Sequence, residues 1–394
     1  MSAKFNGPEL ELPGHLKRAL AAGHPWVYRD HVPRGFRAPA GTWVRIRSGN
    51  FSAYALWDET SPIALRVFSE HAVPDAAWVA ERVHRAKLLR DATLPADTSA
   101  FRLIFGEADG LPGATVDVYG QFAVILTYAD ALDAIVPWLS AALLSELAPH
   151  GVLRRSRDAD GATPRLELLA GRMPPRELTV SEHGHRLIAD LYAGQKSGLF
   201  LDHRENRRYL AGLAAGKRVL NLFSYTGAFS LYAAQAGASS VTSVDSAEPA
   251  TLAAQRNFEL NGLDPTQHEF ITEDVFAFLE RARRKNEKFE LVICDPPSFA
   301  RSHDQLKQAL RAYVSLNSAA LRICEIGGIY AAASCTAQVS PEAFRGVLAE
   351  AACNAKRRFQ IFHDAGHASD HPVLAGHPEG RYLKFMVGRV EAVP

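Results

Sequence analysis

The sequence predicts an α/β protein whose C-terminal half is a doubly wound, mostly parallel sheet, preceded by smaller β-rich units. Three observations predict this class. Helical and strand-like segments alternate from residue 194 onward, whereas short strands dominate before it. The stretch 217–245 reads as strand, tight turn, helix and strand. Two strand-like segments follow the last helix, which suits an antiparallel hairpin added to the sheet edge.

Length and composition describe an ordinary globular chain. The 394 residues leave room for two or three domains, and 47% are hydrophobic and 22% charged. The net charge of +1 means that any affinity for nucleic acid must come from local patches. No apolar run reaches the roughly 18–20 residues that span a bilayer, and no leader opens the chain, so we expect a cytoplasmic protein that does not bind membranes. Four cysteines without ligand-like spacing predict reduced thiols and no metal site: Cys294, Cys324, Cys335 and Cys353.

We expect three domains. Residues 1–72 should form a small β domain, residues 73–190 a central β-rich (α+β) domain, and residues 191–394 the doubly wound domain.

Residues 1–70 contain nine Lys and Arg against six Asp and Glu, and several of the basic residues lie near aromatic residues in the sequence. Such interleaving suits RNA, with Arg29, Arg45 and Arg47 as candidate contacts. Composition alone, however, favours the simpler reading, in which the basic residues lie on a solvated barrel surface and the aromatic residues form its core.

The turn after the strand 218–223 is the candidate cofactor loop. Its residues are Phe223, Ser224, Tyr225, Thr226 and Gly227. A glycine turn that opens a helix places unpaired N–H groups at one spot. One glycine, where G-x-G-x-x-G has three, argues against NAD or FAD and favours a nucleoside without phosphates, such as S-adenosylmethionine. Asp245, which ends the next strand, is placed to accept hydrogen bonds from ribose hydroxyls.

Later strand ends carry further polar groups, at the edge where open α/β sheets bind ligands. Asp274 follows the third strand, where it can accept from an adenine amine or cap the next helix. The motif Asp-Pro-Pro-Ser-Phe follows the fourth strand, and its two prolines make a rigid loop. We expect this loop to aim Asp295 at a base edge while Phe299 packs on a flipped-out base. The predicted base contacts are Asp295, Pro296, Pro297 and Phe299.

Cys335 lies just past the fifth predicted strand and is the candidate nucleophile. Cytosine C5 attacks a sulfonium methyl poorly unless a thiolate first adds at C6, which makes C5 enamine-like. The other reading is a buried, inert thiol, the commoner fate of cysteine. Strand alternation should point Cys294 to the other face, and Cys324 and Cys353 are expected to be structural.

Several segments resemble the bacterial 23S ribosomal RNA cytosine-C5 methyltransferases of the RlmI type. The segment 193–207 is similar to that family's G-Q-K-T/S-G-x-x-L-D-x-R-x-N-R motif. The stretches 223–227, 295–299 and 334–335, the turn 102–113 and the tail 370–384 look like its other landmarks. His203 stands where the family more often carries Gln, and Thr336 where Ser is common.

The resemblance implies an N-terminal β-barrel PUA domain that binds RNA, a central α+β domain and a class I, Rossmann-like methyltransferase domain. It implies S-adenosyl-L-methionine as cofactor, 23S ribosomal RNA as partner (as a large-subunit precursor or deproteinised), and Cys335 and Asp295 as catalytic residues. Around cofactor and base it places Gln195, Asp202, the loop 223–227, Asp245, Asp274 and Asp295. The PUA likeness overturns the compositional reading of residues 1–70. The sequence does not decide the oligomeric state, for which a homodimer is the working expectation.

Two rival classes of function stay open. One is a methyltransferase of the same fold that acts on guanine N7 or adenine N6, targets that need no covalent cysteine. The other is a non-catalytic RNA-binding factor in ribosome assembly, in which the α/β domain is only a scaffold.

Overall fold

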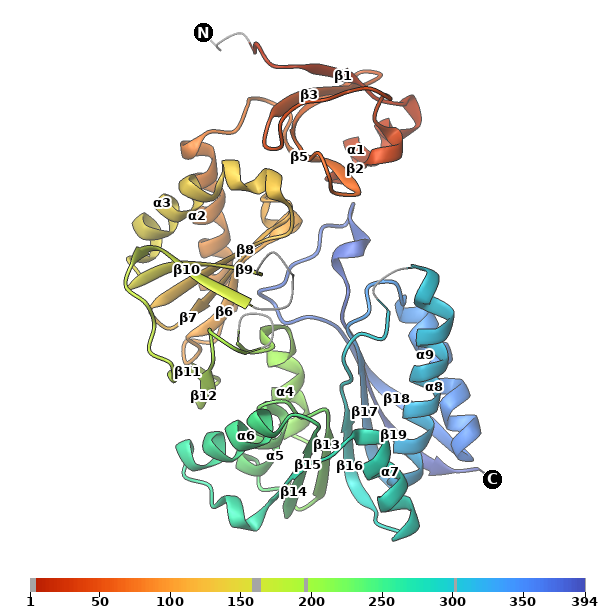
Figure 1. Cartoon of the computed structure of the whole chain (residues 1–394). Coiled ribbons are helices and arrows are strands. Elements are labelled where there is room, and N and C mark those ends of the chain that lie inside the picture. The colour runs from red at the N-terminus through yellow and green to blue at the C-terminus, as the bar shows by residue number, and fades with distance from the viewer. Residues whose placement is uncertain (1–4, 158–163, 195–197, 301–302, 394) are drawn as a thin grey trace. The chain divides into compact units, whose positions relative to one another are not determined.

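The computed structural model describes residues 5–157, 164–194, 198–300 and 303–393 (Figure 1). The chain divides into two compact units. The first unit comprises residues 1–180, 189–201 and 369–380, and the second unit comprises residues 181–188, 202–368 and 381–394. The first unit thus includes the C-terminal segment 369–380. The three-domain boundaries at 72 and 190 remain a prediction.

The N-terminal part of the first unit is a five-stranded sheet in the order β1-β3-β4-β5-β2. Its elements are β1 (Glu9–Glu11), α1 (Lys17–Ala21), β2 (Trp26–Tyr28), β3 (Trp43–Ser48), β4 (Phe51–Trp57) and β5 (Ile63–Ser69). Alternation along β3 buries Val44 and Ile46 and turns Arg45 and Arg47 outward. The three longer strands agree with the segments 43–46, 52–57 and 63–68, which are rich in β-branched and aromatic residues and predict strands, whereas the three-residue strands β1 and β2 are too short to show a period.

The rest of the first unit contains a second five-stranded sheet, in the order β10-β9-β8-β7-β6. Its elements are α2 (Ala76–Thr93), β6 (Ala100–Phe105), β7 (Ala114–Tyr119), β8 (Phe122–Thr127), α3 (Val136–Leu147), β9 (Gly151–Arg157) and β10 (Pro164–Gly171). The strand β9 was not predicted, because three arginines in seven residues hide its apolar side. Two shorter strands, β11 (Leu178–Glu182) and β12 (His185–Ala189), pair with each other.

An ion pair in the first unit anchors the segment 369–380. Arg90 is 1% exposed, and its guanidinium nitrogens lie 2.7 and 2.8 Å from the two carboxylate oxygens of Asp109. Its Nη2 also donates to the backbone oxygen of Asp370 at 2.8 Å. Buried guanidinium groups require such complete pairing, because an unpaired charge away from water is costly. The pairing therefore connects α2 with a segment 280 residues later.

The second unit is a seven-stranded sheet in the order β15-β14-β13-β16-β17-β19-β18. Its strands are β13 (Arg218–Leu222), β14 (Ser240–Asp245), β15 (Glu269–Thr272), β16 (Phe289–Cys294), β17 (Cys324–Ser334), β18 (Arg357–Ala365) and β19 (Lys384–Ala392). The first five in this order run parallel, and β19 is antiparallel to both of its neighbours. The predicted closing hairpin is thus confirmed. The strand order reverses between β13 and β16, where α/β sheets open a crevice for ligands.

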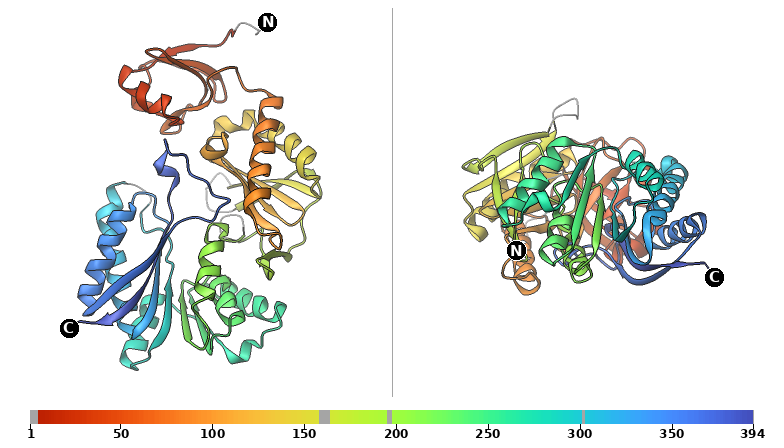
Figure 2. Two further views of the ribbon diagram at one scale, coloured as in Figure 1. Left: turned by 180° about the vertical axis from the view of Figure 1, so that it is seen from behind. Right: turned by 90° about the horizontal axis from the view of Figure 1, so that it is seen from below.

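Helices cover both faces of this sheet, as Figures 1 and 2 show. They are α4 (Arg204–Ala211), α5 (Ala228–Gln235), α6 (Glu248–Leu260), α7 (Val275–Arg284), α8 (Leu306–Ile323) and α9 (Pro341–Ala355). A continuous apolar core joins the strands to α7, α8 and α9, with Val292, Tyr313 and Phe344 fully buried in it. The doubly wound fold predicted for this half of the chain is confirmed. Across the described residues, no helix combines the length and apolarity that a membrane crossing requires.

Candidate cofactor and active site

The loop after β13 has an unusual backbone, which fits the predicted cofactor loop. Phe223, Tyr225 and Gly227 all have positive φ, of 59°, 48° and 73°. Hydrogen bonds within the protein hold this backbone: the N–H of Ser224 donates to the Val244 oxygen, and that of Gly227 donates to the Ser224 oxygen. Gly227 is required on steric grounds too, because a Cβ there would lie 2.7 Å from the Cβ of Ala254. Gly227 therefore combines a positive φ with close packing, and any other residue at this position would be strained.

Two hydroxyls of this loop have no partner among the residues that the structure describes. Ser224 is 6% exposed and Thr226 8%, and neither side-chain oxygen has a hydrogen bond to any described residue. A buried hydroxyl without a partner costs free energy, so these groups suit a polar ligand that the loop would hold. The loop itself is rigid, since Asn257 Nδ2 donates to the Thr226 carbonyl at 2.9 Å. These features fit a nucleoside cofactor such as S-adenosylmethionine.

Asp245 ends β14, as predicted, and also shapes the loop. Its Oδ2 accepts from the backbone nitrogen of Tyr225 at 2.8 Å, and its Oδ1 accepts from that of Ala247 at 3.0 Å. A carboxylate has about four acceptor positions, so both oxygens can still receive ribose hydroxyls. Asp245 therefore combines a structural contact with an open acceptor role.

The remaining predicted cofactor residues differ in their surroundings. Asp202 is 3% exposed, and its Oδ2 accepts from the hydroxyl of Tyr382 at 2.5 Å. Asp274 is exposed and caps α7, where its side chain accepts from the backbone nitrogen of Ala277 at 3.0 Å. Of the two predicted roles, its contacts therefore match that of a helix cap. Gln195 lies outside the described residues.

Asp295 directly follows β16, and its carboxylate faces His203. His203 ends a short 3₁₀ turn, and its Nε2 lies 3.3 Å from Asp295 Oδ2. The imidazole is 3% exposed, and its centroid lies 5.3 Å from the ring of Phe229 and 5.7 Å from that of Phe385. Sequence reasoning treated His203 only as a departure from a family motif. Its contact with Asp295 arises from folding.

Hydrogen bonds connect the loops that follow β16 and β17. Thr336 is fully buried, and its Oγ1 lies 3.0 Å from Ser298 Oγ and 2.8 Å from the hydroxyl of Tyr313. Ser334 Oγ donates to the same tyrosine hydroxyl at 3.1 Å. The residues on both sides of Cys335 are thereby fixed, and one of them is tied to the loop that carries Asp295. This network places the candidate nucleophile and the candidate base-binding carboxylate on connected loops.

The predicted base-contact residues of the loop 295–299 differ in how exposed they are. Pro296 is buried, Pro297 is exposed, and Phe299 is half-buried. The ring of Phe299 packs against that of Tyr313, with a centroid distance of 4.7 Å. Pro297 and Phe299 are therefore the members of the motif with surface left for a ligand.

Lys384, at the start of β19, was not predicted as a site residue. Its side chain is 1% exposed, and its Nζ donates to the backbone oxygens of Thr336 at 2.6 Å and Tyr382 at 2.8 Å. Burial lowers the pKa of Lys384 to about 8, and the negative charge of Cys335 acts in the opposite direction. A buried cation therefore lies beside the candidate nucleophile, where it favours the thiolate.

The other cysteines have different environments. Cys294 is fully buried in the core, and burial raises its pKa to about 12. Burial likewise raises the pKa of Cys324 to about 12. Cys335 is partly exposed, and Cys353 is an exposed residue of α9. Since the thiolate is the reactive form, these environments favour Cys335 over Cys294 and Cys324 as nucleophile.

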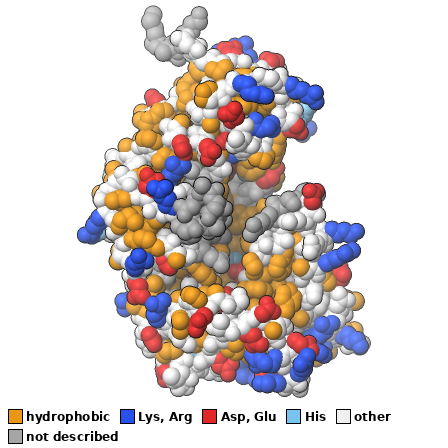
Figure 3. Space-filling view, viewed as in Figure 1, with side chains coloured by type: hydrophobic (Ala, Val, Ile, Leu, Met, Phe, Trp, Pro, Cys, Tyr) orange, Lys and Arg blue, Asp and Glu red, His pale blue; other side chains and the backbone are white. Residues whose placement is uncertain are grey.

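The three arginines predicted to contact RNA differ in how firmly other residues of the protein hold their side chains. Arg29 is held by the backbone oxygens of Asp58 and Ser61, and its guanidinium lies over the ring of Trp57. Arg45 and Arg47 point outward from β3 and share an ion pair with Glu9. Figure 3 shows basic side chains mixed with acidic and apolar ones on the visible face of this N-terminal sheet. Arg29 has mainly a structural role in these contacts, whereas Arg45 and Arg47 lie at the surface.

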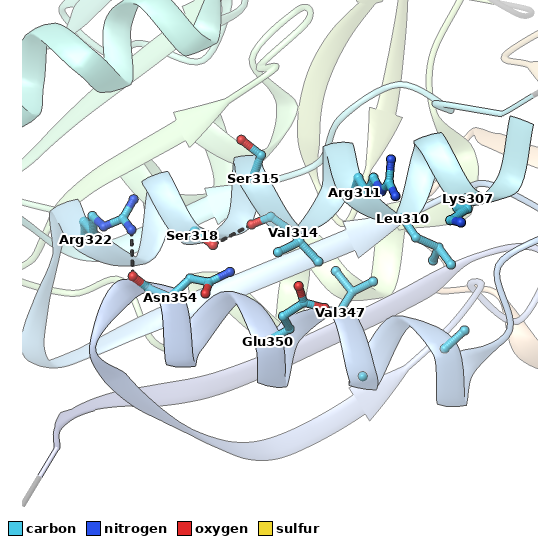
Figure 4. A pocket seen from close by; sticks show the side chains of 12 residues that line it. Lys307, Leu310, Arg311, Val314, Ser315, Ser318, Arg322, Val347, Glu350 and Asn354 are labelled. Atoms are coloured by element: carbon cyan, nitrogen blue, oxygen red, sulfur yellow. Dashed lines mark hydrogen bonds between the residues drawn. The ribbon is translucent and has the colours of Figure 1, made fainter.

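Two further features are made up of residues outside the predicted site. A groove of about 750 Å³ between α8 and α9 is lined by residues such as Arg311, Val347 and Glu350 and contains none of the predicted site residues (Figure 4). In the first unit, His24, His377 and Glu379 cluster within 4.8 Å. The backbone nitrogen of Trp26 donates to His24 Nδ1, so a neutral His24 carries its proton on Nε2, the atom that faces Glu379. That proton arrangement suits a hydrogen bond rather than a metal ligand.

The strand order and the loop geometry place the second unit among the S-adenosylmethionine-dependent methyltransferases. The family model of that description matches residues 137–357, and a PUA-like domain model matches residues 11–70. The chain is 36% identical over 397 residues to ribosomal RNA large subunit methyltransferase I of Klebsiella pneumoniae, covering 97% of this chain and 98% of the relative. It is 37% identical over 388 residues to the Shigella boydii protein of the same name, covering 95% and 97%. The chain belongs to the ribosomal RNA large subunit methyltransferase I family.

Solved structures agree with this assignment. A SAM-dependent methyltransferase from Streptococcus mutans superposes with a TM-score of 0.86 at 25% identity, covering 97% of this chain and all of that one. A methyltransferase solved in complex with SAH gives a TM-score of 0.87 at 26% identity, with the same coverage. The cofactor of this protein is S-adenosyl-L-methionine, as predicted. The unpartnered hydroxyls and the glycine cradle of the loop 223–227 fit that ligand.

Proposed function

We propose that this protein methylates C5 of a cytosine in 23S ribosomal RNA, with Cys335 as nucleophile. The names of the curated relatives support ribosomal RNA as the substrate. The observation that carries the choice of atom is the position of Cys335 after β17, joined through Thr336 and Ser298 to the loop of Asp295. A target with its own lone pair, such as guanine N7, would need no cysteine at this place.

In the proposed reaction, the Cys335 thiolate adds to C6 of cytosine, and the pair of electrons displaced from the C5–C6 bond makes C5 nucleophilic. The bound cofactor supplies the methyl group that C5 takes. A base then removes the C5 proton, and the thiolate leaves C6 to give 5-methylcytosine. Asp295 would hold the polar edge of the pyrimidine while charge shifts into the ring. Lys384 would favour the thiolate before the addition.

The experiment is nucleoside mass spectrometry together with a covalent trap. RNA that carries 5-fluorocytosine should form a stable adduct with the wild-type protein, because fluorine blocks the elimination that frees the thiol. Cys335→Ala should form no adduct and no 5-methylcytosine, while its affinity for cofactor and RNA stays near wild type. Cys294→Ala is the matched control and should retain activity. A fully active Cys335→Ala protein would refute the mechanism and favour guanine N7 or adenine N6, and a wild-type protein without any methylation would favour an assembly factor.

The N-terminal domain is proposed to bind the RNA substrate in the cytoplasm. The PUA-like match over residues 11–70 and the surface position of Arg45 and Arg47 support this role. Deletion of residues 1–70 should then weaken RNA binding and leave cofactor binding intact. Equal methylation by the truncated and complete proteins would refute it. A homodimer remains an expectation, which light scattering of the pure protein would test.

A further inference from the structure

In the second unit, polar contacts connect Asn206 to His203 and His203 to Asp295. Asn206 lies in α4 and is 3% exposed. Its Nδ2 lies 3.1 Å from the backbone oxygen of Gly366 and 3.1 Å from His203 Nδ1. A carbonyl oxygen can only accept, so the contact with Gly366 identifies this atom as the amide nitrogen. The second N–H of Asn206 therefore faces the imidazole.

The contact with Asn206 determines where the imidazole proton lies. An amide nitrogen donates and does not accept, so His203 Nδ1 must offer its lone pair. The ring proton then resides on Nε2, by assignment from the hydrogen-bond network. Nε2 is the atom that lies 3.3 Å from Asp295 Oδ2. The rings of Phe229 and Phe385 pack against the imidazole and hold its plane.

We propose that His203 is a positioning residue for catalysis, which orients the carboxylate of Asp295 through an Nε2–H donor whose tautomer Asn206 fixes. A carboxylate turns about a broad, roughly two-fold torsion, so a donor on Oδ2 selects one orientation. Oδ1 is then left for the substrate. This inference rests on the proposed cytosine chemistry, where Oδ1 would accept from the N4 amine of the base. Uracil carries an oxygen in that position and would be repelled, so the oriented carboxylate also selects cytosine.

The first test compares His203→Gln, which keeps an N–H donor, with His203→Leu, which removes it. Methylation of ribosomal RNA is measured for kcat and KM, and cofactor affinity by calorimetry checks that each variant is folded. His203→Leu should lower kcat by about ten-fold or more, because it removes a hydrogen bond to a charged group. His203→Gln should keep most of the wild-type kcat, and neither variant should change cofactor affinity. A Gln variant as slow as the Leu variant, or a Leu variant as fast as wild type, would overturn the proposal.

The second test removes the donor of Asn206. In Asn206→Leu no amide donates to Nδ1, so the ring proton is no longer confined to Nε2, the atom that faces Asp295. The substitution should therefore lower kcat in the wild-type background but add little to His203→Gln, which has no ring tautomer to switch. Equal losses in both backgrounds would mean that Asn206 acts only through structure and would refute this part of the proposal.

The covalent trap separates this inference from the proposed function. If the wild-type protein forms no adduct with 5-fluorocytosine RNA, the cytosine mechanism itself fails. If the wild type and His203→Leu form the adduct equally fast, only the role of His203 fails.

Discussion

The buried ammonium of Lys384 makes folding stability depend on pH in a direction that can be worked out. Its pKa falls from the ordinary value of 10.5 to about 8 in the folded protein. Between these values the unfolded chain holds the proton and the folded chain does not, so the free energy of unfolding must rise with pH. The difference of 10.5 − 8 = 2.5 pKa units corresponds to about 3 kcal/mol over the whole interval. Lys384→Met should abolish this rise.

The assay is urea unfolding of wild type and Lys384→Met at several values between pH 7.5 and pH 10.5. Their difference in unfolding free energy cancels the titrating groups that do not interact with Lys384, and it should shift by about 3 kcal/mol in favour of the wild type as pH rises. Lys307→Met, at an exposed lysine of α8, is the matched control and should leave the pH dependence of wild type intact. A difference that stays flat across this range would refute the assignment of a lowered pKa to Lys384.

Two further predictions concern cofactor and RNA. Asp245→Ala removes hydrogen bonds to the ribose, worth roughly 1.5–3 kcal/mol together, so calorimetry should show cofactor affinity falling by about ten-fold or more. Because Asp245 also accepts from Tyr225 and Ala247, Asp245→Asn should show whether the fall follows charge or loop shape, and unchanged binding in Asp245→Ala would contradict the ribose role. Charge removal at Arg45 and Arg47 should reduce the slope of log affinity for ribosomal RNA against log salt by about two, with cofactor affinity unchanged. An unaltered slope would exclude both as phosphate contacts.

Much of the second unit follows from local sequence pattern. Apolar runs of strand length and helical periodicity predicted β13 to β19 and the helices between them in the correct order along the chain, because those patterns act within a few residues. Asp245 and the loop 223–227 could be located because glycine and an acidic strand end are local signals. The antiparallel direction of the two closing strands was also predictable, since a parallel pair needs a long crossover connection.

Other features needed the folded chain. The strand β9 has no apolar alternation of its own and becomes a strand by pairing with β8 and β10. One of the hydrogen bonds of Arg90 goes to the backbone oxygen of Asp370, 280 residues later in the sequence.

The sequence by itself determined the class of fold, and it predicted the cofactor loop and the candidate nucleophile, because each of these depends on residue types at short spacing. Only the tertiary structure decided which groups lie beside the loop of Cys335 and beside Asp295. Lys384 approaches the loop of Cys335 because β19 inserts beside β17, and His203 meets Asp295 because the chain before α4 lies at the carboxyl end of β16. Contacts between residues so far apart leave no trace in local periodicity. They exist only because a parallel sheet gathers the ends of its strands at one edge.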